Sequence, residues 1–280
     1  MALLMVGGMT LAAGPRGIRK QAEMSMGLSG WITIAPDGHV IAVTLDQEKT
    51  IGEPFVNFVR SAVMGWVFEP VIIGGQAVTA RATMRLNILG KHRDDGGLDV
   101  SINSAYFGGN NPDASKVKSK TLTPPDYPRD MLAMGAQGIA NLVLKVGRDG
   151  RVADLYVEQV NLNVVAPNEA TMRRIRQSLG NAAMTVARTW EFQVPTQSPE
   201  MDKPYWIVRV PVQYCMNDDC DHNRGQDGEW HAYIPGPRQR APWISDTAWV
   251  NGANSDALAP GGIYMADNTD GPKLLTPLGD

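Results

Sequence analysis

The chain carries one short pattern twice, and this repeat constrains the fold more than any single motif. The first copy reads Ala35-Pro36-Asp37-Gly38-His39-Val40 and ends, after a helical stretch, with Trp66-Val67-Phe68-Glu69-Pro70. The second copy reads Gly147-Arg148-Asp149-Gly150-Arg151-Val152 and ends with Trp190-Glu191-Phe192-Gln193-Val194-Pro195. Because self-similar segments fold into the same supersecondary unit, we expect two copies of one small α/β unit.

Length and charge limit the classes of protein that this chain can belong to. At 280 residues it has room for about two domains, and a hydrophobic fraction of 43% is enough for packed cores. The net charge is −3, from 26 basic and 29 acidic residues. This balance gives no electrostatic reason to expect nucleic acid or an anionic membrane as a partner.

The first residues of the chain are similar to part of an export signal. Residues 1–14 are apolar and uncharged, and they are too few for a membrane span of about 20 residues. They lack the positive start of a secretory signal but otherwise match its apolar region followed by small residues. We expect the remnant of a signal peptide here, with a buried or frayed N-terminal segment as the alternative. No other stretch is apolar over a length that crosses a membrane.

The two cysteines indicate an oxidising compartment. Cys215 and Cys220 are separated by four residues, and we expect them to form a disulfide that closes a short loop. Neighbouring aspartates and His222 raise the alternative of a metal site, but the other three histidines are not spaced as zinc ligands. We therefore expect no metal, no cofactor, and export from the cytoplasm.

In the first unit, turn chemistry and periodicity predict a hairpin followed by a helix. Gly30–Ile34 and Val40–Leu45 are rich in β-branched and aromatic residues, and Gly38 between them is expected at positive φ. Glu53 and Pro54 suit the first turn of a helix. Further strands are expected over 78–88 and 98–102. The expected helix stripe and the core anchors that follow it are Phe55, Val59, Ala62, Trp66 and Phe68.

The second unit repeats this order with a clearer long helix. A short helix over 129–134 ends at Gly135, and strands over 140–146 and 152–160 flank the Asp-Gly turn. A strand over 206–214 contains Pro211, so we expect it at a sheet edge with one side of its ladder open. The apolar face of the long helix is Met172, Ile175, Leu179, Ala182, Val186 and Trp190.

Composition changes at the two remaining segments. Residues 108–120 are rich in glycine and asparagine and end in a basic run, so we interpret them as a linker whose lysines are solvated. From Asp221 onward, prolines and glycines interrupt any periodicity, while tryptophans and tyrosines are scattered between them. These aromatic residues predict an extended arm that packs along the folded units, with one short strand near 230–234.

The second unit resembles the C-terminal domain of TonB, the periplasmic energy transducer of Gram-negative bacteria. The first unit is similar to the same domain over Met26–Ile88, without the Tyr-Pro opening. The residues that carry the resemblance, in matching order and spacing, are Tyr127-Pro128, Gly138, Asp149-Gly150-Arg151-Val152, Trp190-Glu191-Phe192 and Val208-Arg209-Val210-Pro211-Val212.

The resemblance implies an α+β fold of two tandem TonB-like domains, each a small antiparallel sheet packed on one or two helices. A Pro/Gly/Trp-rich C-terminal arm would follow them. The segments expected are a signal-like, irregular start (1–23), a first TonB-like domain (24–105), a linker (106–122), a second TonB-like domain (123–220) and the arm (221–280).

The resemblance also implies a partner. TonB domains capture a short peptide of an outer-membrane transporter by adding it as a strand to a sheet edge. Here that edge would be residues 207–214, which we expect to be unpaired. Beside it, residues 124–128 match the family's Gln-Pro-x-Tyr-Pro segment, except that Pro124 stands in place of glutamine. The implied partner-binding residues are Pro125, Tyr127, Pro128, Ile207, Val208, Arg209, Val210, Val212, Gln213 and Tyr214.

Three functional classes follow, in order of preference. The first is a non-catalytic periplasmic protein that binds a peptide or protein, for which an outer-membrane transporter segment is the candidate. Since the sequence shows no membrane span and no long Pro-Lys or Pro-Glu spacer, we expect binding without transmission of force. The second is a structural or assembly component that forms a homodimer through the same sheet edge.

An enzyme is the third class and is not expected. The sequence contains no Gly-x-Ser-x-Gly, no His-Glu-x-x-His and no Gly-rich phosphate loop. Asp37 and Asp149 are a candidate pair of catalytic carboxylates. Each precedes a glycine in a hairpin turn, where aspartate is favoured for local backbone hydrogen bonds.

Overall fold

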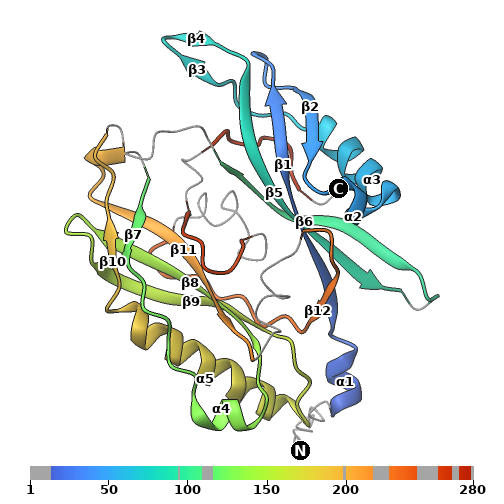
Figure 1. Cartoon of the computed structure of the whole chain (residues 1–280), viewed down its shortest axis with the longest axis vertical. Coiled ribbons are helices and arrows are strands. Elements are labelled where there is room, and N and C mark those ends of the chain that lie inside the picture. Colours follow the sequence, from blue (N-terminus) through green and yellow to red (C-terminus); the bar gives the residue numbers. More distant parts are fainter. Residues whose placement is uncertain are drawn as a thin grey trace, which may run out of the picture.

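Two antiparallel sheets, each with its own hydrophobic core, form the main part of the fold (Figure 1). The computed structural model describes residues 14–93, 95–108, 116–197, 200–216, 227–244, 258–266 and 271–278. Within these residues the protein has a mixed α+β fold, as the sequence predicts, and its sheets are antiparallel. No helix of the described ranges is long and apolar enough to cross a bilayer.

The first sheet has the strand order β12-β1-β5-β6, and β2 also pairs with β1. Side chains alternate along β1, so that Met26 and Leu28 lie in a core shared with α3, which covers one face of this sheet. The elements of this unit are β1 (Glu23–Ile34), β2 (Val40–Leu45), α2 (Glu48–Ile51), α3 (Glu53–Met64), β3 (Ile72–Ile73), β4 (Gln76–Ala77), β5 (Ala80–His92), β6 (Leu98–Gly108) and β12 (His231–Tyr233).

The second sheet has the strand order β13-β11-β8-β9, and α5 packs on its apolar face. The N-cap of α5 is Asn168, whose side chain accepts a hydrogen bond from the Thr171 N–H at 2.9 Å. The elements of this unit are β7 (Lys118–Thr121), α4 (Arg129–Ala133), β8 (Gly138–Gly147), β9 (Val152–Leu162), α5 (Glu169–Ala187), β10 (Glu191–Gln193), a 3-10 turn (Glu200–Asp202), β11 (Tyr205–Tyr214) and β13 (Tyr264–Met265).

The two copies of the repeated pattern form the same contact in each unit. Gly38 has φ +91°, and its carbonyl accepts a hydrogen bond of 2.8 Å from the Phe68 N–H. Gly150 has φ +76°, and its carbonyl accepts a hydrogen bond of 2.8 Å from the Phe192 N–H. A Cβ atom at either glycine would lie within 2.2 Å of the carbonyl oxygen of that phenylalanine. The repeat therefore encodes a hairpin turn that docks on the segment after the helix.

Helix faces differ from the expected stripes by about one position. The buried residues of α3 are Val56, Val59 and Val63, whereas the expected Phe55 and Ala62 are only partly buried. The reason is that the valines point most directly at the sheet, and the larger Phe55 ring instead meets Trp230 edge-on at 5.5 Å. In α5, the buried residues likewise include Ala183 and Ala187, while the expected Ala182 and Val186 are partly buried. Trp66 and Phe68 are buried core anchors, as predicted.

Two segments that were expected to be irregular contain regular structure. Helix α1 (Pro15–Arg19) precedes β1, and its Ile18 is fully buried in the core of the second sheet. Strand β7 lies in the expected linker and pairs with β10, where Lys120 Nζ lies 2.8 Å from a Glu191 carboxylate oxygen. Lys120 is therefore part of a strand with an ion pair and not a purely solvated connector.

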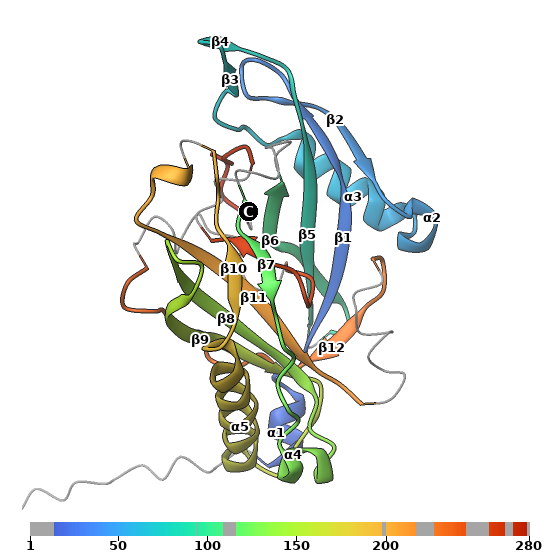
Figure 2. The same cartoon turned by 60° about the vertical axis from the view of Figure 1, so that its left-hand side comes forward.

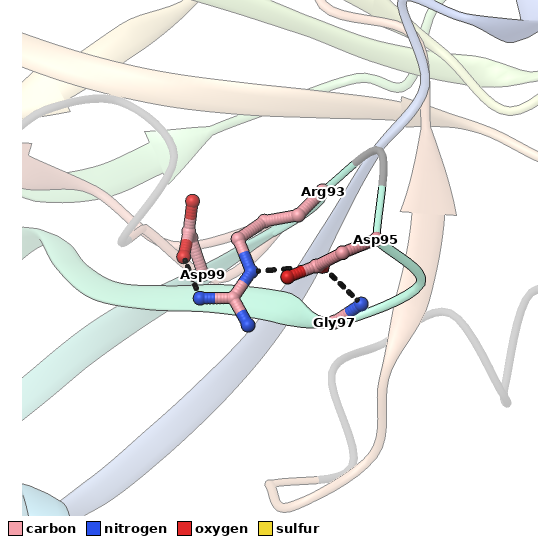
Figure 3. Close-up of polar contacts among 4 residues, drawn as sticks. All are labelled: Arg93, Asp95, Gly97 and Asp99. Carbon is pink, nitrogen blue, oxygen red and sulfur yellow. Dashed lines mark hydrogen bonds and ion pairs between the residues drawn. The ribbon is translucent and has the colours of Figure 1, made fainter.

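An exposed, charged turn joins β5 to β6 (Figure 3). The Arg93 guanidinium donates to Asp95 Oδ1 at 3.2 Å and to Asp99 Oδ1 at 3.3 Å. Asp95 also accepts a hydrogen bond from the Gly97 N–H at 2.8 Å. The three charged side chains are more than half exposed, so these ion pairs add little stability and serve to shape the hairpin.

The C-terminal residues lie along both sheets (Figures 1 and 2). Strand β12 falls within the range expected for a short strand, and its three residues pair with Glu23–Ser25 of β1. Ile234 and Leu162 then exchange two backbone hydrogen bonds at the outer edge of β9. Further on, Leu274 forms an isolated bridge with Phe68 in the first unit. A single segment thus connects the edges of two sheets that the domain boundaries from the sequence would separate.

Candidate functional site

The outer edge of β11 is the site that the sequence singles out. On its inner side, β11 pairs with β8 over all ten residues, from Tyr205 opposite Gly147 to Tyr214 opposite Gly138. On its outer side, β13 pairs with it in antiparallel register, which places Met265 opposite Val208. The expectation of an unpaired edge is therefore wrong for this part of the strand.

Two hydrogen bonds extend the contact beyond the short strand β13. The Ala266 N–H donates to the Ile207 carbonyl at 2.8 Å, and the Gly261 N–H donates to the Pro211 carbonyl at 3.1 Å. The nitrogen of Pro211 faces the outer side of β11, as its carbonyl does. The N–H that proline lacks is therefore missing from the outer edge and not from the ladder with β8. The proline thus marks the outer edge correctly, although the chain's own residues 261–266 cover that edge.

Most side chains of the predicted binding strand are buried. Val208, Val210, Val212 and Tyr214 belong to the core of the second sheet. On the other face, Ile207, Arg209 and Gln213 are buried or half-buried. Selectivity from side-chain pockets at this edge is therefore limited, and the backbone of β11 is the main surface that an added strand can use.

Arg209 forms a buried ion pair that the sequence did not predict. Its Nε donates to Glu158 Oε2 at 2.9 Å, and its Nη2 donates to Glu158 Oε1 at 3.0 Å. Its Nη1 also donates to the Ala266 carbonyl at 3.3 Å. The exposed fraction is 2% for the Arg209 side chain and 0% for the Glu158 side chain. Arg209 therefore links β9, β11 and the segment that covers the edge, and it is not available to a partner.

The Tyr-Pro opening lies at the end of β11. Tyr127 meets Tyr214 edge-on with 5.4 Å between the ring centroids, and its hydroxyl donates to the Ala136 carbonyl. The Tyr214 hydroxyl donates to the Leu179 carbonyl at 2.9 Å, and burial raises the pKa of Tyr214. Pro125 and Pro128 are half-buried beside them. The structure thus brings the two predicted segments together, in contacts that hold α4 and α5 against the sheet.

The predicted disulfide lies partly outside the described residues. Cys215 directly follows β11 and is not a free thiol. Cys220 lies outside the described ranges, as do residues 1–13 of the expected signal peptide. Both expectations stay predictions. Within the described ranges, no group of three or more His, Cys, Asp and Glu side chains is placed to hold a metal ion.

Sequence reasoning missed β13 and the partner of Arg209. The signal for β13 is weak, because Ile263, Tyr264 and Met265 form only a three-residue apolar run after two glycines. The signal for the ion pair is clearer. Arg209 is the one charged residue in the mainly apolar strand β11, and charges at such positions are seldom buried unless they are paired. Strand β9 carries Asp154 as well as Glu158, so the sequence does not single out the partner.

Comparison with known proteins does not identify a family for this chain. No protein-family model matches the sequence, and no curated protein matches it. Among solved structures, the chain is similar to the solution NMR structure of Pseudomonas aeruginosa TonB CTD, with 19% identity and a TM-score of 0.28. The match covers 39% of this chain and 93% of that one. A TM-score this low carries no argument about fold or function.

Proposed function

We propose that the chain is a non-catalytic periplasmic protein of two tandem TonB-like domains that binds a peptide or protein partner at the outer edge of β11. The partner enters by strand exchange, in which it replaces the chain's own β13. The chain's own β13 covers part of this edge, which counts against a free binding edge, so the proposal requires that β13 be displaced. What supports it is that the backbone of β11 pairs with an added antiparallel strand in this register. An edge that accepts one extended segment in this register has the geometry to accept another.

The internal strand is short enough to be replaced. Strand β13 has two residues, and two flanking hydrogen bonds come from Ala266 and Gly261. A backbone hydrogen bond contributes a net stabilisation of about 0.5–1.5 kcal/mol, so the backbone part of this contact contributes a few kcal/mol. A partner strand that pairs along 207–214 would form a longer ladder than β13 does.

A partner strand must also replace the buried side chain that β13 contributes to the core. Met265 is 3% exposed and belongs to the core of the second sheet. A competing peptide therefore needs an apolar residue opposite Val208. It must also overcome an internal strand whose effective concentration is on the order of millimolar. A segment of an outer-membrane transporter is the partner class that the TonB-like motifs favour.

The second candidate function is assembly of a homodimer by the same exchange. If two copies donate β13 to each other, the edge contacts are preserved and only the connection changes. Because β13 comes from a part of the chain far from β11 in sequence, exchange between two copies favours this alternative over pairing of two bare edges. Light scattering over a range of concentrations separates the two functions, because a monomer at all concentrations contradicts assembly.

The test is binding of a fluorescein-labelled peptide that copies residues 259–266, followed by anisotropy. In Tyr264→Pro the internal strand loses a backbone donor that faces Arg209, so we expect at least tenfold tighter peptide binding than to the wild-type protein. Ala232→Pro is the matched control, because it weakens the C-terminal segment in β12 and leaves β13 intact. Absence of binding to folded Tyr264→Pro, or equal gains in both variants, would refute strand exchange at β11.

A further inference from the structure

A cavity of about 110 Å³ with both polar and apolar walls lies between the two sheets. The first sheet contributes Ser25 and Asn87 to its wall, and the second sheet contributes Asn141. Of the described residues, five carboxamide side chains line it, together with hydroxyl and ring groups and the apolar Ile139, Leu258 and Ala259. The five carboxamides are Asn87, Asn141, Asn161, Asn163 and Gln213.

Strand alternation explains how polar side chains reach the space between the sheets. In β1, Met26 and Leu28 enter the core beside α3, so the intervening Ser25 and Gly27 lie on the opposite face. In β8, Ala140 and Leu142 enter the core beside α5, so Asn141 lies on the opposite face. The serine and the glycine leave room, because neither side chain reaches across to the second sheet.

Two buried polar atoms in this wall have no hydrogen-bond partner among the residues that the structure describes. They are Oδ1 of Asn141, a residue that is 3% exposed, and Nε2 of His231. Polar atoms at buried positions are nearly always paired, and leaving one unpaired costs free energy. Since both residues line the cavity, a molecule bound there can supply the missing partners.

The wall carries no excess charge. Among the described residues of the wall, Arg85 alone carries a permanent charge, and its Nη2 lies 3.6 Å from Asp227 Oδ1. Its Nη1 donates to Ser29 Oγ at 3.0 Å. Because Asp227 balances the guanidinium, an anionic ligand would gain little from this wall. Carboxamides both donate and accept hydrogen bonds, which matches hydroxyl groups that do the same.

We propose that this cavity is a binding site for a small, uncharged polyhydroxy molecule, of the polyol or monosaccharide class. A cavity needs at least about 10–15 Å³ to hold one water, so this cavity is large enough for a small ligand with several hydroxyl groups. The cavity is also lined by Gln213 and Tyr214 of β11 and by residues 258–260, which precede β13. Displacement of β13 would therefore disturb its wall, and the ligand is tested on the protein with β13 in place.

The test uses TROSY NMR titrations of the full chain with D-ribose, D-glucose and glycerol. We expect saturable shifts of the backbone amides of Ser25, Asn141 and Asn163 with at least one of the three. Asn141→Ala should weaken that binding at least tenfold, while Asn57→Ala, on an exposed position of α3, should leave it unchanged.

A second variant keeps the proposal open to refutation if Asn141→Ala does not fold. Ser25→Val adds bulk to the cavity on a strand position that suits a β-branched residue, and it should abolish the saturable shifts. Absence of saturable shifts in the wild-type protein, which would mean that water alone fills the cavity, overturns the proposal. Wild-type affinity in both folded variants overturns it equally.

Discussion

Removing Glu158 should destabilise the protein strongly, because it leaves the Arg209 charge buried without a partner. The guanidinium makes two hydrogen bonds to the Glu158 carboxylate, at 2.9 and 3.0 Å, and a third to the Ala266 carbonyl. At 2% exposure, water cannot replace the lost carboxylate. We therefore consider the variant Glu158→Leu, which keeps the approximate volume and removes the charge.

The expected loss follows from the burial of the pair. Breaking a buried ion pair by removing one partner costs about 3–5 kcal/mol. Total stabilities are about 5–15 kcal/mol, so the loss is a large fraction of the free energy of unfolding. With about 2–4 °C in Tm for each kcal/mol in a domain of 150–250 residues, Tm should fall by roughly 6–20 °C.

The double variant Glu158→Leu/Arg209→Met makes the prediction specific. Replacing both members of a buried pair by apolar residues of similar volume is often neutral or stabilising by about 1–4 kcal/mol. The double variant should therefore be more stable than Glu158→Leu alone. It should also release the bond from Arg209 to the Ala266 carbonyl, which loosens the segment beside β13.

Urea unfolding followed by circular dichroism measures these free energies. Asp130→Ala is the control, because Asp130 pairs with Arg174 at an exposed site, where the two side chains are 52% and 65% exposed. That change should cost no more than about 1 kcal/mol. The reasoning is refuted if Glu158→Leu costs as little as the control, or if the double variant loses the sum of the two single losses.

Two further predictions concern a glycine and a tyrosine. Gly150→Ala should lower the free energy of unfolding by at least about 1 kcal/mol more than Gly135→Ala. Both glycines have positive φ, but of the two only Gly150 would place a Cβ 2.2 Å from the Phe192 carbonyl oxygen. Equal losses in urea unfolding would contradict the docking role of this turn. Burial raises the pKa of Tyr214 from its usual 10.0, so the unfolded state ionises first and stability should fall as pH rises above about 10. In Tyr214→Phe this fall should be shallower, and an unchanged slope of stability against pH would refute the assignment.

Local features of the fold could be predicted because their causes are local. Strand β2 has the expected bounds Val40–Leu45, since the Asp-Gly turn and the β-branched residues act over a few positions. Gly38 has the positive φ that its turn requires. The faces of α3 and α5 were predicted only to within about one position, because the direction of a helix toward its sheet depends on packing with distant strands.

The candidate site was predicted in part. Pro211 indicated an outer edge, and Tyr127 does lie beside Tyr214 at the end of that strand. The strand that covers the edge could not be predicted, because Tyr264 and Met265 have no periodicity of their own. Their conformation is decided by which backbone groups of β11 are left unpaired after β8 has paired with the other side.

The sequence by itself determined the repeated unit: a hairpin turn, a helix and an anchoring Trp-x-Phe, each encoded by neighbours within a few residues. Only the tertiary structure decided what the C-terminal segment covers, that Arg209 meets Glu158, and that Asn141 faces a cavity shared with the other sheet. The physical reason is the same in each case. These contacts join residues far apart in the chain, and their partners are chosen by the edges, charges and faces that local folding leaves unsatisfied.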